Sequence, residues 1–188
     1  MQVFNLRKDT RLPGLWATLL IFLLAAAFGC QAQEPPLSPA AAAFKKEIKD
    51  CIARLSQPLG EPLVQGNLAA IQDILKKNEP DAVKLCRMCP FRIGVLDVQG
   101  DTLTVYPFKK DAMGSFSHYN VVMQALKTQK VTQDRMFLQD GSKLYIVCTP
   151  IKHQDQVVGV LAVGLSSEEA EKRWGITEKE FLALDFNR

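Results

Sequence analysis

The strongest hydrophobic pattern in the chain is a run of apolar residues near its C-terminal end, Val157 to Leu165. A second apolar run, Tyr145 to Ile151, precedes it, and the polar residues 153–156 separate the two. Two β-branched runs joined by a few turn-forming residues predict a β-hairpin. Because the later run is apolar at successive positions, both faces of that strand should be covered, which predicts a central strand of a sheet.

Helical spacing comes earlier in the chain. Apolar residues recur three and four positions apart over 40–55, and again over 67–77 behind Asn67, a predicted N-cap. A mixture of proline and glycine after residue 57 should end the first of these helices. Near the C-terminus, residues 166–169 and 177–180 both have the capping-box pattern that opens a helix, and Gly175 should end the first of that pair.

From Phe91 onward the period changes from helical to two, which predicts strands. The turn at residues 99–101 should connect two of them, and an irregular and helical excursion then precedes three more. The strands are expected over residues 91–98, 102–106, 131–139, 143–150 and 157–165, with a helix over 120–130. This order predicts an α+β fold, with a five-stranded antiparallel sheet, a long N-terminal helix and helices packed on one face.

The last predicted hairpin carries a family resemblance. A strand ending in Thr149-Pro150-Ile151, a short polar turn, and then Val158-Gly159-Val160-Leu161 is similar to the closing hairpin of extracytoplasmic Cache sensor domains, which are relatives of the PAS fold. The resemblance covers residues 40–165. It implies a domain that binds a small molecule between the sheet and the excursion after the second strand, and that forms a homodimer through its first helix.

The first 29 residues have the pattern of an export signal, with a positive n-region before an apolar h-region over residues 15–28. Cys30 follows small residues and resembles the lipidated cysteine of bacterial lipoproteins, whereas Ala27 and Gly29 also fit an ordinary cleavage site. An uncleaved signal anchor is the third reading, because about 17 apolar residues suffice to span a bilayer. The expected organisation is a leader over 1–29, a tether over 30–43, the ligand-binding domain over 44–165 and C-terminal helices over 166–188.

Removing this leader brings the charge close to balance. The whole chain has 23 basic and 20 acidic residues. Residues 1–29 hold three of the basic and one of the acidic side chains, so 20 basic and 19 acidic residues remain. Nucleic-acid binding needs a basic surface that neutralises phosphates. The balance therefore excludes nucleic acid as a partner.

Four cysteines follow the leader: Cys51, Cys86, Cys89 and Cys148. An even number in an exported chain is typical of disulfides, and four cysteines allow three complete pairings. The Cys86–Cys89 pair is followed by proline rather than histidine, which excludes c-type haem attachment. A redox disulfide at this pair is one alternative to a structural one. A zinc or iron–sulfur site is another, and it would need Cys51 and Cys148 to converge on the pair.

The resemblance implies a ligand site lined by the excursion and by the third and fourth strands. Its expected residues are Tyr106, Lys109, Phe116, His118, Arg135, Phe137 and Tyr145. Arg135, Phe137 and Tyr145 should share a face of the sheet if the two strands pair through the turn at residues 140–141. A guanidinium fork matches the two oxygens of a carboxylate, which favours a small carboxylate as ligand. The alternative is that Arg135 is a solvated strand residue and Tyr145 ordinary core.

The motifs of catalysis are missing from the sequence: it has no nucleophile elbow, phosphate loop or His-x-x-x-His pair. We therefore expect no enzyme activity and no cofactor. The sequence predicts an exported, membrane-tethered module that binds a small molecule and reports through a separate signalling protein. A periplasmic thiol–disulfide redox protein and a sensor carrying haem or a cluster, in which His118 could bind the iron, are the alternatives.

Overall fold

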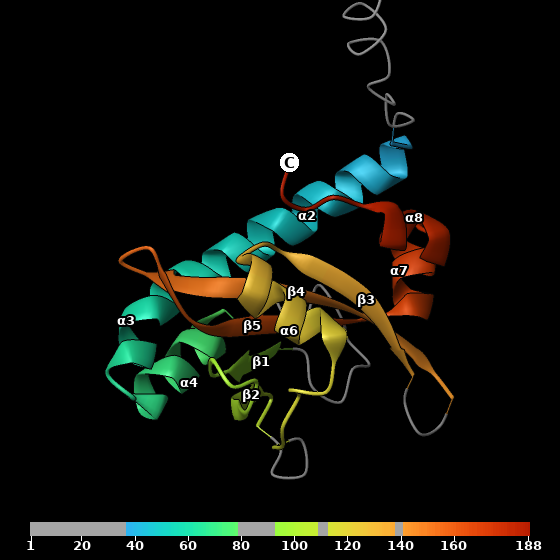
Figure 1. Cartoon of the computed structure of the whole chain (residues 1–188). Helices are drawn as coiled ribbons and strands as arrows, with labels where there is room; N and C mark the ends of the chain where they lie inside the picture. Colours follow the sequence, from blue (N-terminus) through green and yellow to red (C-terminus); the bar gives the residue numbers. More distant parts are fainter. Residues whose placement is uncertain (1–36, 79–92, 109–112, 138–140) are drawn as a thin grey trace, which may run out of the picture. The chain divides into compact units, whose positions relative to one another are not determined.

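Five strands form one antiparallel sheet in the order β2-β1-β5-β4-β3 (Figure 1). The computed structural model describes residues 37–78, 93–108, 113–137 and 141–188. The strands are β1 (Ile93–Leu96), β2 (Thr102–Tyr106), β3 (Thr132–Phe137), β4 (Lys143–His153) and β5 (Gln156–Ser166). The predicted α+β class and five-stranded antiparallel sheet are confirmed.

The last strand, β5, lies in the middle of the sheet, as its uninterrupted apolar pattern predicted. It pairs with β4 along almost its whole length and with β1 over Val160 to Val163. The hairpin turn before it places Gln154 and Asp155 in the left-handed region, with φ of 48° and 63°. Two consecutive left-handed residues are the requirement of a type I′ turn, whose twist matches that of the flanking strands.

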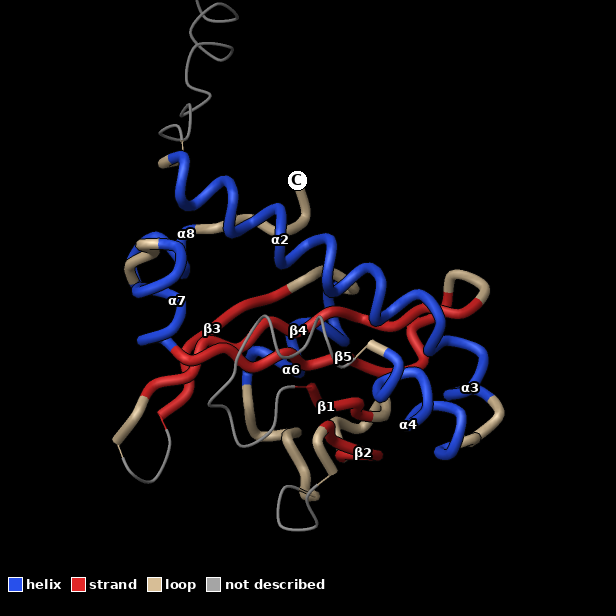
Figure 2. Tube along the Cα trace, turned by 180° about the vertical axis from the view of Figure 1, so that it is seen from behind, coloured by secondary structure: helices blue, strands red, loops and turns tan. Residues whose placement is uncertain are grey.

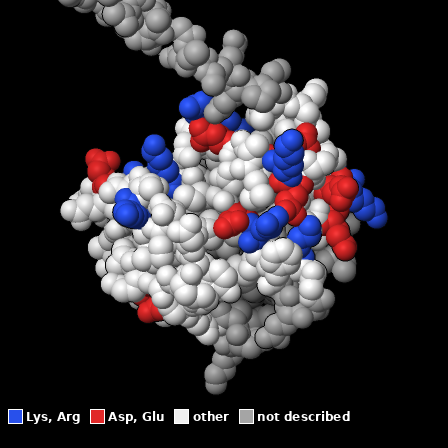
Figure 3. Space-filling view, turned by 45° about the vertical axis from the view of Figure 1, so that its right-hand side comes forward, with Lys and Arg blue, Asp and Glu red and all other residues white. Residues whose placement is uncertain are grey.

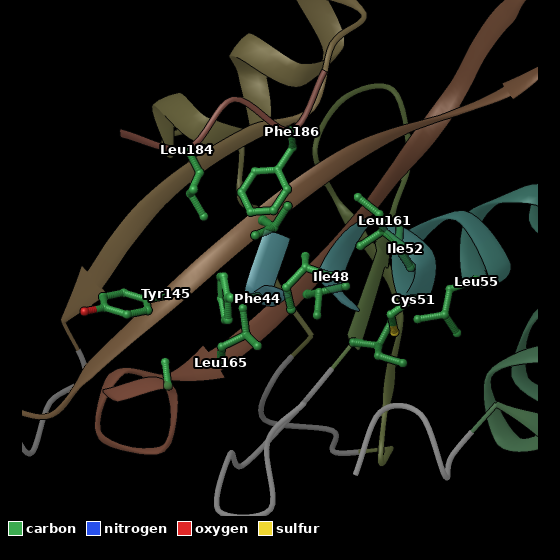
Figure 4. Packing of buried hydrophobic residues seen from close by; sticks show 14 of the residues in the cluster. Phe44, Ile48, Cys51, Ile52, Leu55, Tyr145, Leu161, Leu165, Leu184 and Phe186 are labelled. Atoms are coloured by element: carbon green, nitrogen blue, oxygen red, sulfur yellow. The ribbon is translucent and has the colours of Figure 1, made fainter. Parts of the chain in front are cut away.

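Helix α2 (Pro39–Ser56) lies along one face of the sheet (Figure 2). Ser38 caps it, because the Ser38 hydroxyl accepts a hydrogen bond from the Ala41 N–H. The side chains of α2 point toward those of β4 and β5 (Figure 4). We call this cluster the helix-side core; its buried members include Phe44, Ile48, Cys51, Leu55, Ile93, Val95, Tyr145, Val147, Leu161, Val163, Leu165, Phe181, Leu184 and Phe186.

Three short helical elements continue from α2 toward the first strands. They are η1 (Gln57–Leu59), α3 (Gly60–Val64) and α4 (Leu68–Lys77). The predicted N-cap of α4 is confirmed, since the Asn67 side chain accepts from the Ala70 N–H. Gln72 of α4 donates to the buried Thr104 hydroxyl of β2 at 3.4 Å, which places this helix beside the outer strand of the sheet.

Helix α6 (Asn120–Thr128) covers the opposite face of the sheet. Its buried residues pack against alternate residues of β1, β4 and β5 and form what we call the crossover-side core: Leu96, Val121, Val122, Ala125, Ile146, Cys148 and Val160. The chain crosses from β2 to β3 over this face, and we call residues 113–131 of that connection the crossover segment. The helices are thus divided between the two faces, where the sequence had placed them on one.

The C-terminal helices α7 (Ser167–Trp174) and α8 (Glu178–Ala183) belong to the same compact unit as the sheet, residues 37–188. Thr177 and Glu180 form a complete capping box at the start of α8, and Gly175 ends α7 with φ of 67°, both as predicted. The Phe44 ring makes edge-to-face contacts with Trp174 and with Phe181, with ring centroids 5.3 Å and 6.2 Å apart. These contacts join both helices to α2.

Charges of both signs lie next to one another on the surface that carries α7, α8 and the end of β3 (Figure 3). Glu178 of α8 accepts from Arg135 of β3 and from Lys143 of β4, and Glu47 of α2 accepts from Arg173 at 3.1 Å. Among the residues described, no helix has both the length and the apolar character that crossing a membrane requires.

Candidate functional site

Small side chains meet on the crossover side of the sheet, at its centre. The strand register places Gly94 of β1 opposite Ala162 of β5, and Ala162 opposite Cys148 of β4. Directly opposed residues of antiparallel strands project from the same face. The row Gly94–Ala162–Cys148 therefore runs across three adjacent strands on the face that the crossover segment covers.

Gly94 is buried, and a methyl group there would fit among its neighbours. A Cβ at this position would find its nearest neighbours at 3.9 to 4.0 Å, in the side chains of Val105, Ala162 and Leu96, which is ordinary contact distance. Gly159 of the same sheet is different, because a Cβ there would lie 2.5 Å from the backbone oxygen of Leu96. Two strands approach each other closely at Gly159, so a side chain does not fit there, whereas a methyl group would fit at Gly94.

Solvent reaches the middle of this row. Ala162 is half-buried, although both its neighbours on the central strand, Leu161 and Val163, are 0% exposed on the opposite face. A residue at the centre of a sheet covered on both sides is normally sealed. The partial exposure of Ala162 therefore shows that the crossover segment does not close over the centre of the sheet completely.

Aromatic residues of the crossover segment lie on the same side of the sheet as this row. Phe116 and Tyr119 are half-buried and pack against the crossover-side core, with ring centroids 5.3 Å apart. His118 is exposed, and its ring lies 4.1 Å from that of Tyr119. The segment is fixed to the β1–β2 turn, since the Phe116 N–H donates to the Gly100 carbonyl at 2.8 Å. An aromatic wall and a floor of small residues suit a small organic ligand.

The structure places the strand residues of the predicted site on the other face. Arg135 and Tyr145 are directly opposed, and Phe137 shares their face, so the predicted pairing of the two strands is confirmed. That face belongs to the helix-side core, however, since Arg135 is ion-paired with Glu178 and Tyr145 stacks on Phe181. Burial, and then the negative charge of Glu171, raise the pKa of Tyr145.

The seven predicted residues are therefore not brought together. Phe116 and His118 lie on the crossover side, whereas Arg135, Phe137 and Tyr145 lie on the helix side, and Tyr106 packs against the helix-side core as well. Lys109 falls outside the described residues. The correction follows from the register: Ile146 and Cys148, the residues that alternate with Tyr145 and Val147, are those that face α6.

Two of the cysteines can be placed, and they lie on opposite sides of the sheet. Cys51 of α2 belongs to the helix-side core, and Cys148 of β4 to the crossover-side core. A sheet between them prevents their convergence on one metal or cluster, and no group of three potential metal ligands occurs among the described residues. Burial raises the pKa of the Cys148 thiol, which is not in a disulfide. Cys30, Cys86 and Cys89 lie outside the described residues.

Gly94, Ala162 and Cys148 were not among the residues predicted to bind the ligand, and Cys148 was predicted only as a disulfide candidate. The period of two does place these three on common faces of their strands, but the burial pattern of β4 conceals which face is which. Residues 144–148 are all buried, because helices cover both sides. Hydrophobicity therefore carries no signal there, and only the position of α6 identifies the face.

The fold is that of the PAS/Cache-like sensor domains, as solved structures show. The ligand-binding domain of the Pseudomonas aeruginosa amino acid chemoreceptor PctC, in complex with GABA, superposes with a TM-score of 0.52 at 16% identity over 71% of this chain. That of PctB from the same organism, in complex with L-Arg, gives 0.54 at 15% identity over 71%. That of the Pseudomonas fluorescens chemoreceptor CtaA, with L-isoleucine, gives 0.50 at 17% over 71%.

This chain covers between 54 and 59% of the length of those three domains. No family model matches its sequence, and no curated protein matches it. The predicted Cache-like architecture is confirmed at the level of the fold. The neighbours are small-molecule-binding sensor domains rather than enzymes.

Proposed function

We propose that this chain is an extracytoplasmic sensor module that binds a small molecule between the centre of its sheet and the crossover segment. The observation that carries the proposal is the partial exposure of Ala162 at the centre of the sheet, next to Gly94, where an added methyl group would meet only ordinary contacts. The fold supports it, because three domains with the same fold were solved with small ligands bound. The leader over residues 1–29 would tether the module to a membrane, with or without lipidation of Cys30.

A ligand that carries a carboxylate is the class we favour. GABA, L-Arg and L-isoleucine, the ligands of the three similar domains, each carry one. A carboxylate is best held by charged or hydrogen-bonding donors. The donors we favour are the Tyr119 hydroxyl and His118, whose ring lies beside that of Tyr119, and Lys109 is proposed as the cation. Ala162 and the Phe116 ring, which are both partly exposed, would contact the ligand's carbon chain.

The module would report binding to a separate signalling protein, either alone or as a homodimer through α2. Charged residues gather on the described surface of α7 and α8, which suits contact with solvent or with a polar partner. Neither a cofactor nor a catalytic step is part of the proposal. The Cys86–Cys89 pair is not assigned a role in it.

A thermal-shift screen of the full chain against GABA, the proteinogenic amino acids and small carboxylates tests this function. Binding to the native state raises Tm by mass action. We expect a stabilising compound whose effect is lost in Ala162→Leu, because the added side chain would occupy the space above the row. Ala53→Leu, at an exposed alanine of α2, is the matched control and should keep the shift.

Arg135→Ala distinguishes the two faces of the sheet. If the ligand binds on the crossover side, this variant keeps the thermal shift, because Arg135 contacts Glu178 on the other face. Loss of the shift in Arg135→Ala together with its retention in Ala162→Leu would place the ligand on the helix side and contradict the proposal.

A further inference from the structure

The C-terminal residues 184–188 are hydrogen-bonded to the start of β3. The Asn187 side chain accepts from the Val131 N–H at 2.8 Å and donates to the Val131 carbonyl at 3.0 Å. Gln133 donates to the Leu184 carbonyl as well. A carboxamide has both a donor group and an acceptor group side by side, as a backbone residue does. Asn187 therefore pairs with the edge of the sheet as a neighbouring strand residue would.

Asn187 is itself held in this orientation. The Asp185 carboxylate accepts from the Asn187 backbone N–H at 2.9 Å and from its side-chain amide at 3.2 Å. The amide is thus oriented by a neighbour within the same short segment. Its two surface bonds to Val131 are therefore made by an amide that the Asp185 carboxylate orients.

The start of β3 is also hydrogen-bonded to α6. The Thr132 hydroxyl donates to the Val121 carbonyl in the first turn of α6 at 2.7 Å. Helix α6 ends at Thr128, and its C-cap Gln129, with a left-handed φ of 56°, turns the chain toward Val131 two residues later. A displacement of α6 relative to the sheet would therefore move the residues that Asn187 binds.

The other side of the C-terminal segment belongs to α2. Leu184 and Phe186 are each 2% exposed and lie in the helix-side core with Phe44 and Ile48 (Figure 4). Lys49 of α2 donates to the Arg188 carbonyl. One short segment thus contacts, through different residues, the strand that carries α6 and the helix on the opposite face.

We propose that residues 184–188 form a strap that couples α6 on the crossover side to α2 on the helix side. When α6 is displaced, Val131 and Thr132 move with it, and the hydrogen bonds of Asn187 are strained. The packing of the strap residues Leu184 and Phe186 against α2 is then weakened. The strap offers a route by which a change at the crossover face reaches the opposite face around the edge strand β3 rather than through the centre of the sheet. The inference goes beyond ligand binding and does not depend on the identity of a ligand.

Hydrogen–deuterium exchange of the full chain tests the strap. A hydrogen bond of ordinary net strength corresponds to a roughly two- to tenfold change in a local opening equilibrium. We expect Asn187→Ala to speed exchange by roughly this factor in both α6 and α2, and to leave α4 unchanged. Asn187→Asp keeps an acceptor for the Val131 N–H but turns a carboxylate oxygen toward the Val131 carbonyl and the Asp185 carboxylate, so its effect in the same two helices should be at least as large.

Two further variants make the result decisive. Thr132→Val removes only the bond to α6, and it should still speed exchange in α2, an effect that should disappear when Asn187 is already alanine. Gln65→Ala removes an exposed hydrogen bond from the Gln65 side-chain amide, at the end of α3, to Glu61. This variant should change the exchange rate of neither α2 nor α6. Faster exchange confined to residues 131–133 and 184–188, or an equal rise in α4 that signals general destabilisation, would overturn the proposal.

Discussion

The ring of Tyr145 stacks on the ring of Phe181, with centroids 4.2 Å apart and planes inclined by 9°. Tyr145 belongs to β4, and Phe181 to α8, so this contact joins the sheet to the C-terminal helices. It also fixes the position of a residue that the sequence had assigned to the ligand site. Tyr145 contributes to packing on the helix side, and its neighbour Ile146 faces the crossover segment.

Truncating Phe181 should be costly. The side chain is 0% exposed and contacts both Phe44 and Tyr145, so Phe181→Ala is expected to lower the free energy of unfolding by about 3 to 5 kcal/mol. Leu182→Ala, one residue further along α8 at a side chain that is 40% exposed, should cost less than about 1 kcal/mol. Urea denaturation measures both. Similar losses in the two variants would show that α8 is not anchored by this stack.

Two glycines of the sheet should respond in opposite ways to alanine. Gly94→Ala meets its neighbours only at 3.9 to 4.0 Å, so it should be neutral or stabilise by about 0.4 to 1 kcal/mol through the unfolded chain. Gly159→Ala meets a backbone oxygen at 2.5 Å, so it should lower the free energy of unfolding by more than about 1 kcal/mol. Urea denaturation of both variants tests directly whether a methyl group fits at Gly94. A marked loss in Gly94→Ala would show that it does not.

Acid should weaken the attachment of α8. Glu180 accepts from the Thr177 backbone N–H, and from the hydroxyls of Thr177 and Ser38, and these bonds lower its pKa from the ordinary 4.5. A carboxylate with a lowered pKa stabilises the fold above its ordinary pKa, and this stability is lost as the pH falls through the lowered value. Wild type should therefore be more stable than Glu180→Gln at neutral pH, and the difference should shrink as the pH falls below 4.5. Unfolding curves across that range provide the measurement; a constant difference would contradict the expectation.

The Cys148 thiol should be unreactive in the folded protein. It is 0% exposed, and burial raises the pKa of the thiol, so the thiolate that reacts with alkylating agents is scarcely formed. Mass spectrometry after brief iodoacetamide treatment at mildly alkaline pH should find Cys148 unmodified, and urea should make it react. Rapid native labelling would instead show that the crossover-side core opens to solvent on the timescale of the experiment.

Much of the sheet could be predicted from the sequence because its signals are local. The period of two gave β2 at its observed bounds, and the polar turn before β5 gave the closing hairpin. The strand pairing through residues 140–141 follows from the same period, so Arg135 was correctly placed opposite Tyr145. Local signals cannot tell which helix covers which face of the sheet, because β4 is buried on both faces.

Long-range contacts explain the remaining differences. The sequence suggests that Arg135 binds an anion, but its guanidinium forms an ion pair with Glu178, 43 positions later in the chain. Asn187 and Val131 are 56 positions apart, and nothing near either residue indicates their pairing. Such contacts depend on where α8 and the C-terminal segment pack, which is decided by the burial of Phe181, Leu184 and Phe186 rather than by any periodic pattern.

The placement of β5 between β1 and β4 has a consequence for biosynthesis. As the chain emerges during synthesis or export, the β1–β2 and β3–β4 hairpins appear first, but each lacks the neighbour that would join it to the other. The sheet can be completed only once residue 166 has emerged as well. Until then two separate ribbons expose unpaired edges, so this domain depends for its assembly on the last strand to be translated.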